Sequence, residues 1–551
     1  MKKKIRQSDK LTDHKNTPPF VFDKHKMTKG YGDTRFRFMP CGFAPDELNQ
    51  MIYVKYKTHR QQFSDLDCKI LSTDIDHIHY DLPDREILLT KSNYALGGTR
   101  PFNNPKTGDH WHKSVSLSPL TSVADDYYFD RFMINPSAFS AKTEPRIRDS
   151  KTCYTNDKII CSDSSAYQIF QGSAQFVDPD DLCKFYLNNV DEGVVIDIPT
   201  RSLFDKKEIL EHTVKIQNLN TRYMKNLLKE RPDFRLITVF HGLEIEYSDY
   251  FRNKIEEFDD DFQIAAIAGL MNLNPLEAAH KVLWTILRGK LYPQYHMLGV
   301  GHPILLAIII WISYQLKKFN KNVLLTSDAS SPILLSAQQT YYSQAAFHEG
   351  LNLTRFGIKM DTNKEAPGGH IANPHRRIAT IDPISEIVGG YQDIISAYNT
   401  SATRAYVKYI NILSTVRYCN LMCNYASKMD KKQYKELLLE QYKRSTHSQI
   451  ISNAMEYIEM AFDSGLEKAF QKFKYYMPKL SGERTLHNFP PLYDIESEDK
   501  QNSIIKKKLM NKHIKQVIKN YYEFHKTGKK PKVYSNKELL EHIRKLQIVR
   551  K

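Results

Sequence analysis

Three aspartates each end a short apolar run, and their type and placement suit nucleophilic and acid–base chemistry. Asp163 ends the run from Ile159, Asp197 ends Val194-Val-Ile-Asp197, and Asp328 ends the run from Val323. One carboxylate can act as a nucleophile that forms a covalent intermediate, while a second moves protons on the reacting groups. A helix cap or a structural ion pair would explain any single one of them. Their joint placement favours a catalytic set.

These runs belong to a series of six that returns about every thirty to forty residues, as the strands of a parallel β/α barrel do. The other three runs are 236–242, 264–270 and 295–301. The stretches between them have the length and composition of crossover helices, and Pro275 and Pro303 sit where a helix's first turn accepts proline. Active sites of such barrels form at the C-terminal ends of the strands, where the aspartates are expected.

The apolar run from Ile304 to Ile312 needs its own interpretation. A membrane span needs about 20 apolar residues, and this run is soon followed by Lys317 and Lys318. We therefore expect a buried barrel helix, with an interfacial anchor as the alternative.

The chain holds 551 residues, more than the roughly 250 of one ordinary barrel. We predict an α/β protein built on a (β/α)8 TIM-like barrel at 130–394, with Asp130–Ile134 as an early strand. A basic arm (1–30) and an N-terminal elaboration (31–129) precede it. A helical region packed on the barrel (395–490) and a basic extension (491–551) follow.

The N-terminal residues lack the apolar core of a secretory signal, and the 7 cysteines form an odd, scattered set. This pattern predicts free thiols in a reducing compartment. Cytoplasm is the expected location, meaning host cytoplasm if the chain is viral.

Positive charge is concentrated at the two ends of the chain. Residues 501–551 carry a net charge of +12 and residues 1–30 a net charge of +6, which leaves −2 of the total +16 for the rest. A phosphate backbone suits such an end, because each lysine contact releases condensed counterions. A solvated charged helix is the alternative, and the interleaved Ile504, Leu509 and Ile514 predict a docked amphipathic helix. The candidate nucleic-acid contacts are Lys506, Lys507, Lys508, Lys512, Lys515, Lys529 and Lys530.

The segment Ser162-Asp163-Ser164-Ser165-Ala166-Tyr167-Gln168 resembles the Asp-Ser-Gly-Gly-Phe/Tyr-Gln loop of the tRNA-guanine transglycosylase family. These enzymes exchange a guanine base for a 7-deazaguanine without breaking the sugar-phosphate chain. Further segments resemble the family in the same order over about residues 130–340. They are Val-Ile-Asp197, Phe-His241-Gly242, Ala-Gly269-Leu270, Leu298-Gly299-Val-Gly301 and Ser-Asp328.

The resemblance implies a role for each matched position. Asp328 would be the nucleophile at the anomeric carbon, Asp163 the general acid/base, and Asp197 the acceptor for guanine's N1–H and amino group. The rest of the base site would come from backbone donors near the glycines, from an apolar sandwich by Tyr167 and Leu298, and from neighbouring groups. The remaining positions of that site are Gln168, His241, Gly242, Gly269, Leu270 and Gly299.

The chain also departs from the family. Ser165 and Ala166 replace two glycines, and His241 replaces a glutamine. The family's Cys-x-Cys-x-x-Cys zinc signature is absent. Cys419, Cys423 and His447 could supply three ligands of a structural zinc, at a looser spacing. The chemistry itself requires no cofactor.

These departures, the added length and the cationic ends make the chain resemble the DpdA-type DNA 7-deazaguanine transglycosylases of bacteria and bacteriophages. The implied partners are duplex DNA with its target guanine flipped out, and a free 7-deazaguanine base such as the 7-cyano form. Accessory proteins are compatible with this hypothesis, and a membrane is not expected. The alternatives are the same exchange on tRNA, or a barrel that binds nucleic acid or hydrolyses an N-glycoside without exchange.

Overall fold

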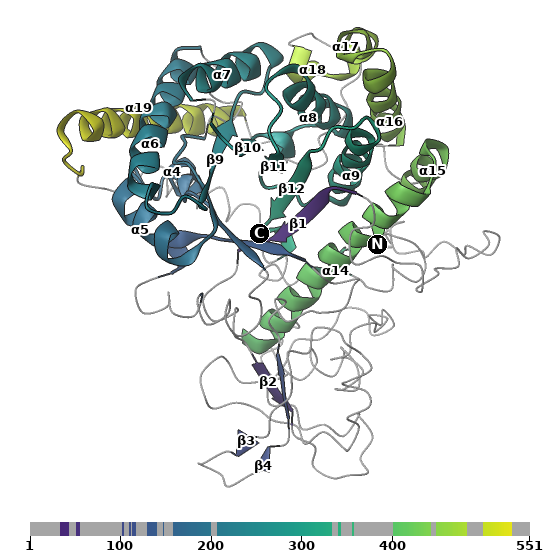
Figure 1. Ribbon diagram of the computed structural model, residues 1–551, viewed down its shortest axis with the longest axis horizontal. Helices are drawn as coiled ribbons and strands as arrows, with labels where there is room; N and C mark the ends of the chain where they lie inside the picture. The colour runs from purple at the N-terminus through teal and green to yellow at the C-terminus, as the bar shows by residue number, and fades with distance from the viewer. Residues whose placement is uncertain are drawn as a thin grey trace, which may run out of the picture.

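The computed structural model describes residues 34–42, 129–139, 158–199, 207–259, 261–332, 401–441, 448–481 and 500–531, with Ile147 and a few short strands besides. Eight parallel strands form one sheet in the order β1-β12-β11-β10-β9-β8-β7-β6, and a bridge between Cys41 and Met133 joins its two edges. Helices surround this sheet (Figure 1). The predicted (β/α)8 barrel is therefore confirmed.

Each barrel strand is short and buried, as the apolar runs predict. The strands are β1 (Phe36–Pro40), β6 (Arg131–Ile134), β7 (Ile159–Ser162), β8 (Glu192–Val194), β9 (Arg235–Phe240), β10 (Ile264–Ile267), β11 (Gln294–Met297) and β12 (Leu324–Ala329). The first of them lies in the segment that the sequence assigned to an N-terminal elaboration. It pairs with the last strand in a register that sets Met39 beside Asp328. About 90 residues thus separate the first barrel strand from the second along the chain.

The crossover helices lie on the outside of the barrel. They are α4 (Ala166–Gln171), α5 (Pro179–Asn189), α6 (Lys207–Leu228), α7 (Ile245–Phe258), α8 (Pro275–Arg288) and α9 (Pro303–Lys318). Proline begins both α8 and α9, and a capping box between Asn274 and Glu277 fixes the start of α8. The run Ile304–Ile312 is buried within α9, in agreement with the barrel-helix interpretation. Among the described residues, no helix has the length and hydropathy of a membrane span.

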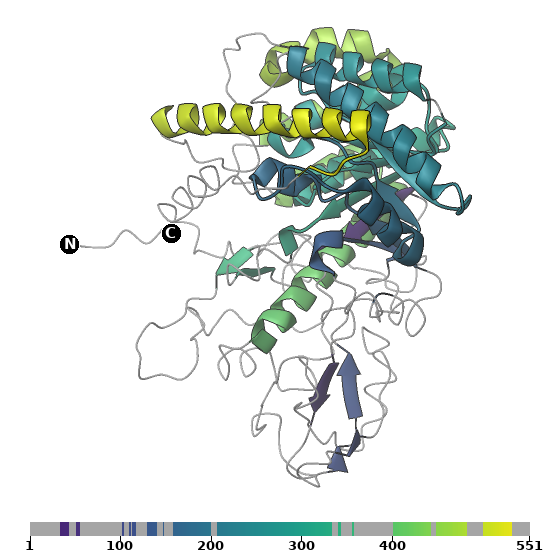
Figure 2. The same cartoon turned by 90° about the vertical axis from the view of Figure 1, so that its left-hand side faces the viewer.

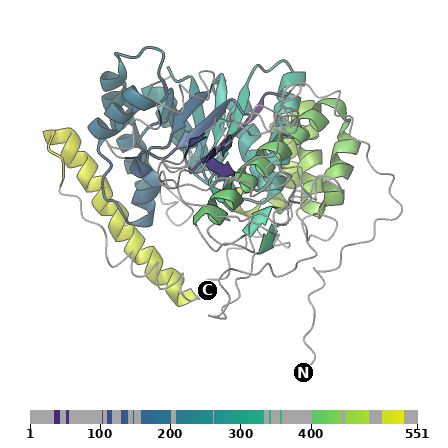
Figure 3. The same ribbon diagram turned by 90° about the horizontal axis from the view of Figure 1, so that it is seen from below.

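A second set of helices packs on the barrel from two sides (Figure 3). On one side lie α14 (Ser401–Lys428), α15 (Lys431–Gln441), α16 (Ser448–Asp463), α17 (Leu466–Phe473) and α18 (Pro478–Ser481). Tyr434 of α15 stacks on Trp311 of α9 and donates to the Ala307 carbonyl at 2.9 Å. His280 of α8 meets the Tyr457 hydroxyl of α16 at 2.5 Å. These contacts attach the helical region to α8 and α9.

On the other side, the long helix α19 (Lys500–Thr527) lies across α6 and α4 (Figure 2). Its apolar side is buried through Ile514, Val517, Tyr521 and Phe524, which confirms the docked amphipathic helix. The Tyr521 hydroxyl accepts from the Val177 N–H at 3.0 Å and lies 3.1 Å from the Val177 carbonyl oxygen.

The remaining short elements complete the description. The 3₁₀ turns are η6 (Pro136–Ala138), η7 (Leu270–Asn272) and η8 (Lys474–Tyr476). Three antiparallel pairs lie outside the barrel sheet: β2 (Met51–Val54) with β5 (Lys113–Ser116), β3 (Phe102–Asn103) with β4 (His110–Trp111), and β13 (Thr340–Tyr342) with β14 (Arg355–Gly357).

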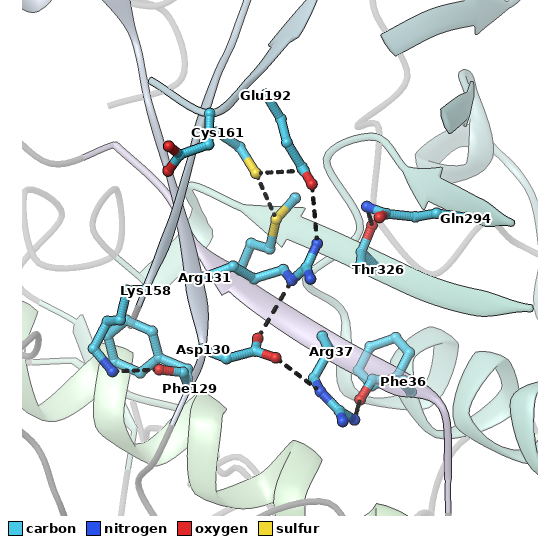
Figure 4. A network of polar contacts seen from close by, with 12 residues as sticks. Phe36, Arg37, Phe129, Asp130, Arg131, Lys158, Cys161, Glu192, Gln294 and Thr326 are labelled. Atoms are coloured by element: carbon cyan, nitrogen blue, oxygen red, sulfur yellow. Dashed lines mark hydrogen bonds and ion pairs between the residues drawn. The ribbon is translucent and has the colours of Figure 1, made fainter. Parts of the chain in front are cut away.

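A layer of paired charges lies at the N-terminal ends of the strands (Figure 4). Glu192, the first residue of β8, is fully buried and forms ion pairs with Arg131 at 3.6 Å and with Arg235. The Cys161 thiol donates to the same carboxylate at 2.9 Å. Because burying an unpaired charge is costly, this carboxylate needs its arginines. The layer stands at the end of the barrel opposite to the three aspartates.

Candidate active site

The three aspartates predicted from the sequence come together at the C-terminal ends of the barrel strands. Asp163 directly follows β7, Asp197 follows β8 by three residues, and Asp328 lies near the end of β12. The Ser164 hydroxyl donates to Asp197 Oδ1 at 3.2 Å, which joins the first two strand ends. The negative charges of Asp197 and Asp328 both act on Asp163, so the three carboxylates share one electrostatic environment.

Asp328 is held as an ionised carboxylate by two hydrogen-bond donors and a neighbouring histidine. Its Oδ1 accepts from the Gly299 N–H at 2.7 Å and lies 3.0 Å from His296 Nε2, while the Cys41 thiol meets Oδ2 at 3.4 Å. Burial acts to raise the pKa of Asp328, but the His296, Gly299 and Cys41 contacts outweigh it and hold that pKa below its ordinary value. The thiol contact is the weakest of the three, so Oδ2 is the oxygen most available for attack on a sugar carbon.

His296 is a site residue that the sequence analysis missed. It is fully buried in β11, and its Nδ1 lies 3.0 Å from the Thr326 hydroxyl. Its Nε2 is close to Asp328 but is not aligned as a hydrogen bond, so the contact is mainly electrostatic. The sequence feature that could have identified it is a histidine inside the apolar run 295–301.

Asp163 has the opposite tendency. Burial, followed by the charges of Asp197 and Asp328, raises its pKa to about 7, although backbone N–H groups of Ser164 and Ser165 favour the ionised form. Ser165 holds a left-handed backbone with φ of 61°, a conformation that glycine adopts at no steric cost. Ser165 thus provides one of these backbone donors at a position where the tRNA-guanine transglycosylase motif has glycine.

Asp197 pairs with the residue that departs from the family pattern. His241 Nε2 lies 2.7 Å from Asp197 Oδ2, and both residues are about 5% exposed. With Ser164 on the other oxygen, the carboxylate still has lone pairs for further donors, since two oxygens offer about four acceptor sites. An N1–H and an amino group of guanine are donors of that kind.

Two glycines shape the strand ends around these groups. Gly242, directly after His241, has φ of +96°, and a Cβ there would come within 2.5 Å of the Ser248 backbone nitrogen. Gly299 has φ of +71°, and a Cβ there would meet the Met271 sulfur at 2.9 Å. Neither position has room for a side chain without local movement, and at Gly299 the backbone N–H itself contacts Asp328.

The other residues predicted to contact the base differ in how far their side chains are buried. Leu298 is partly buried beside Gly299, whereas the Leu270 side chain is fully buried in the apolar core, so only its backbone can reach a ligand. Gln168 lies in α4, four residues beyond Ser164. The side chain of Tyr167 lies outside the described residues.

The predicted nucleic-acid lysines fall on or just beyond α19. Lys512, Lys515 and Lys529 are exposed, as are Lys519 and Lys526. Lys530 instead forms ion pairs with Asp178 at 2.5 Å and Asp180 at 3.3 Å, which reduces the charge it can offer to a phosphate. For Lys506, Lys507 and Lys508 the structure describes the helical backbone only.

The candidate zinc ligands remain a prediction. Cys419 and Cys423 are fully buried on α14, and burial raises the pKa of both thiols, for Cys423 to about 12. His447 lies outside the described residues. Within the described ranges, no group of three potential ligands could hold a metal ion.

Comparison with known proteins gives two weak matches. The chain is 24% identical over 225 residues to the tRNA-guanine(15) transglycosylase of Methanococcus aeolicus, covering 39% of this chain and 32% of that enzyme. It is 26% identical over 209 residues to the tRNA-guanine(15) transglycosylase of Pyrobaculum aerophilum, covering 36% and 40%. The chain has weak homology to tRNA-guanine transglycosylases.

That homology supports the superfamily resemblance seen in the strand-end motifs. The matched segment spans less than half the length of either transglycosylase. No protein-family model matches the chain.

Proposed function

We propose that this chain is a guanine transglycosylase that exchanges a guanine base in a nucleic acid for a 7-deazaguanine. The main support for this proposal is that Asp163, Asp197 and Asp328 converge at one end of the barrel, and that the pKa values of Asp163 and Asp328 are shifted in opposite directions. Two carboxyl groups whose environments separate their pKa values suit an acid and a nucleophile in one site.

The proposed reaction has two steps, in which guanine first leaves the sugar and the incoming base then takes its place. Asp328 attacks the anomeric carbon, the C1′–N9 bond breaks with its electron pair going to guanine, and Asp163 supplies a proton to the departing base. The incoming base then loses a proton to Asp163, its nitrogen attacks the same carbon, and the aspartyl–sugar bond breaks to regenerate Asp328. Asp197 holds each base in turn by accepting its N–H groups.

DNA is the proposed polymer. The exposed lysines of α19 offer sequence-independent phosphate contacts, and they lie on a helix packed against α4, which begins three residues after Asp163. Reaching a guanine in duplex DNA requires flipping it out, at a cost of a few kcal/mol that backbone contacts help to offset.

Exchange on tRNA is the second candidate, favoured by the substrate in the names of both matched relatives. One assay separates the two: labelled 7-deazaguanine is offered with DNA or with tRNA, and the polymer that acquires the label is identified. Label in tRNA alone would reject DNA as the substrate. Base release without incorporation would instead indicate hydrolysis.

The nucleophile has its own test. Wild-type protein should form a covalent adduct with its nucleic-acid substrate that survives denaturation, and Asp328→Ala should abolish it. Asp233→Ala, a change at an exposed aspartate outside the site, serves as the matched control. A normal adduct yield with Asp328→Ala would refute the assignment.

A further inference from the structure

A buried lysine lies behind two of the glycine-bearing strand ends. Lys281 belongs to α8 and is 4% exposed. Its Nζ donates to the Ala268 carbonyl at 2.8 Å and also to the Gly242 carbonyl. These carbonyls lie just past the ends of β10 and β9, so one ammonium group ties two neighbouring strand ends together.

This contact determines the direction of a backbone donor. In a planar trans peptide, the C=O and the N–H point in opposite directions. The Ala268 carbonyl is directed to α8 on the outside of the barrel, so the Gly269 N–H of the same peptide faces the other way, where the strand ends meet. Among the described residues, no protein group accepts from the Gly269 N–H.

The ammonium also strengthens that donor. A hydrogen bond from a cation polarises the peptide group and makes its N–H a better donor in a poorly solvated site. Gly269 has φ of +83° and carries no side chain that could shield the donor. An acceptor oxygen on a flat base at the strand ends is the kind of ligand that such a group recognises.

We propose that Lys281 is a positioning residue that directs and strengthens the Gly269 N–H as the donor to the six-position oxygen of the purine. This inference rests on the proposed base exchange. A lysine that only tied β9 to β10 would stabilise the fold without distinguishing one purine from another.

The test compares two bases that differ at that atom. Guanine and 6-thioguanine share the N1–H and amino group facing Asp197, but sulfur is a weak acceptor. Equilibrium dialysis with each labelled base gives the affinity ratio for wild-type protein and for Lys281→Met. We expect wild type to prefer guanine, and Lys281→Met to reduce this preference about 3- to 10-fold by weakening guanine binding alone.

Lys225→Met is the control, because Lys225 also donates to a backbone carbonyl, that of Asp261, but it lies on α6 and pairs with the Asp259 carboxylate. It should leave the ratio unchanged. If Lys281→Met does not unfold cooperatively, the same ratio is measured with Lys281→Gln, and Lys281→Arg should restore part of the preference.

Equal weakening of both bases, or an unchanged ratio, would overturn the role of Lys281. Failure of wild-type protein to bind either base would instead count against the proposed function.

Discussion

At the scale of single residues, the protein treats two neighbouring carboxyl groups differently. The contacts of Asp328 with His296, Gly299 and Cys41 hold its pKa low, whereas burial and then two neighbouring carboxylates raise the pKa of Asp163 to about 7. Near neutral pH the first is therefore ionised and the second is partly protonated. Attack by one and proton donation by the other require this combination.

The pH dependence of adduct formation should report Asp163. Departure of guanine needs the protonated form, so the rate should fall as pH rises through about 7. Asp163→Asn should slow the step by about 100-fold or more and remove this pH limb. Single-turnover measurements across pH, with Asp233→Asn as control, would show it. A limb that persists in Asp163→Asn would assign the proton to another group.

The raised pKa of Asp163 also predicts how the stability of the folded protein changes with pH. The folded state raises the pKa of Asp163 from 3.8 to about 7, so it binds a proton more tightly than the unfolded chain does. The resulting stabilisation is present below about pH 4 and is lost as pH rises to about 7. Relative to Asp163→Asn, wild-type protein should therefore lose stability across this window in urea unfolding.

At the scale of elements, the barrel separates its charges between its two ends. The strand ends that carry Asp163 and Asp328 leave their carboxylates with donors of modest strength, whereas Glu192 at the opposite end is matched by two arginines. Asp163 and Asp328 therefore remain able to react, whereas the carboxylate of Glu192 is fully engaged by its ion pairs. The Glu192 layer is accordingly assigned to stability.

Glu192→Gln tests that assignment. It removes one of the two carboxylate partners of Arg131, whose side chain is about 5% exposed and which keeps Asp130 at 3.3 Å, and should lower the free energy of unfolding by about 3 kcal/mol. Urea denaturation measures the change. Glu257→Gln, which breaks the exposed ion pair with Lys254 on α7, should have little effect. Comparable small losses in both variants would show that the buried layer is not a stability element.

At the scale of the whole molecule, α19 joins the cationic end of the chain to the segment that follows Asp163. His513 lies 2.7 Å from the Ile169 carbonyl, and Asn520 donates to the Gln175 carbonyl at 3.2 Å. Deletion of 501–551 would therefore expose an apolar surface and disturb α4, which makes it a poor test of nucleic-acid binding. Substitutions on the exposed side of the helix are the sharper test.

The combined variant Lys512→Gln, Lys515→Gln and Lys519→Gln should weaken DNA binding at all sequences alike. Each lost phosphate contact should reduce the magnitude of the slope of log affinity against log salt by about 0.9. A control with the same charge change at Lys432, Lys468 and Lys472, exposed on α15 and α17, should leave the slope unaltered. Equal slopes in the two variants would remove α19 from the proposed interface.

The sequence alone was sufficient for the barrel and for the positions of its three aspartates. Apolar runs that recur at barrel spacing determine parallel strands, because each must be buried on both faces, and residues at their ends must lie on one rim. The first strand, Phe36–Pro40, could not be recognised in this way, since about 90 residues separate it from the next. Only its pairing with β12 places it in the barrel.

The tertiary structure alone decided the environment of each group. No spacing in the sequence indicates that His296 and Cys41 meet at Asp328, that His241 pairs with Asp197, or that Lys281 reaches two strand ends. Each contact joins residues from different strands or helices, and a pKa depends on distances and burial that local sequence does not encode. The order of residues thus determined where chemistry can occur, and packing determined the protonation state in which each group is held.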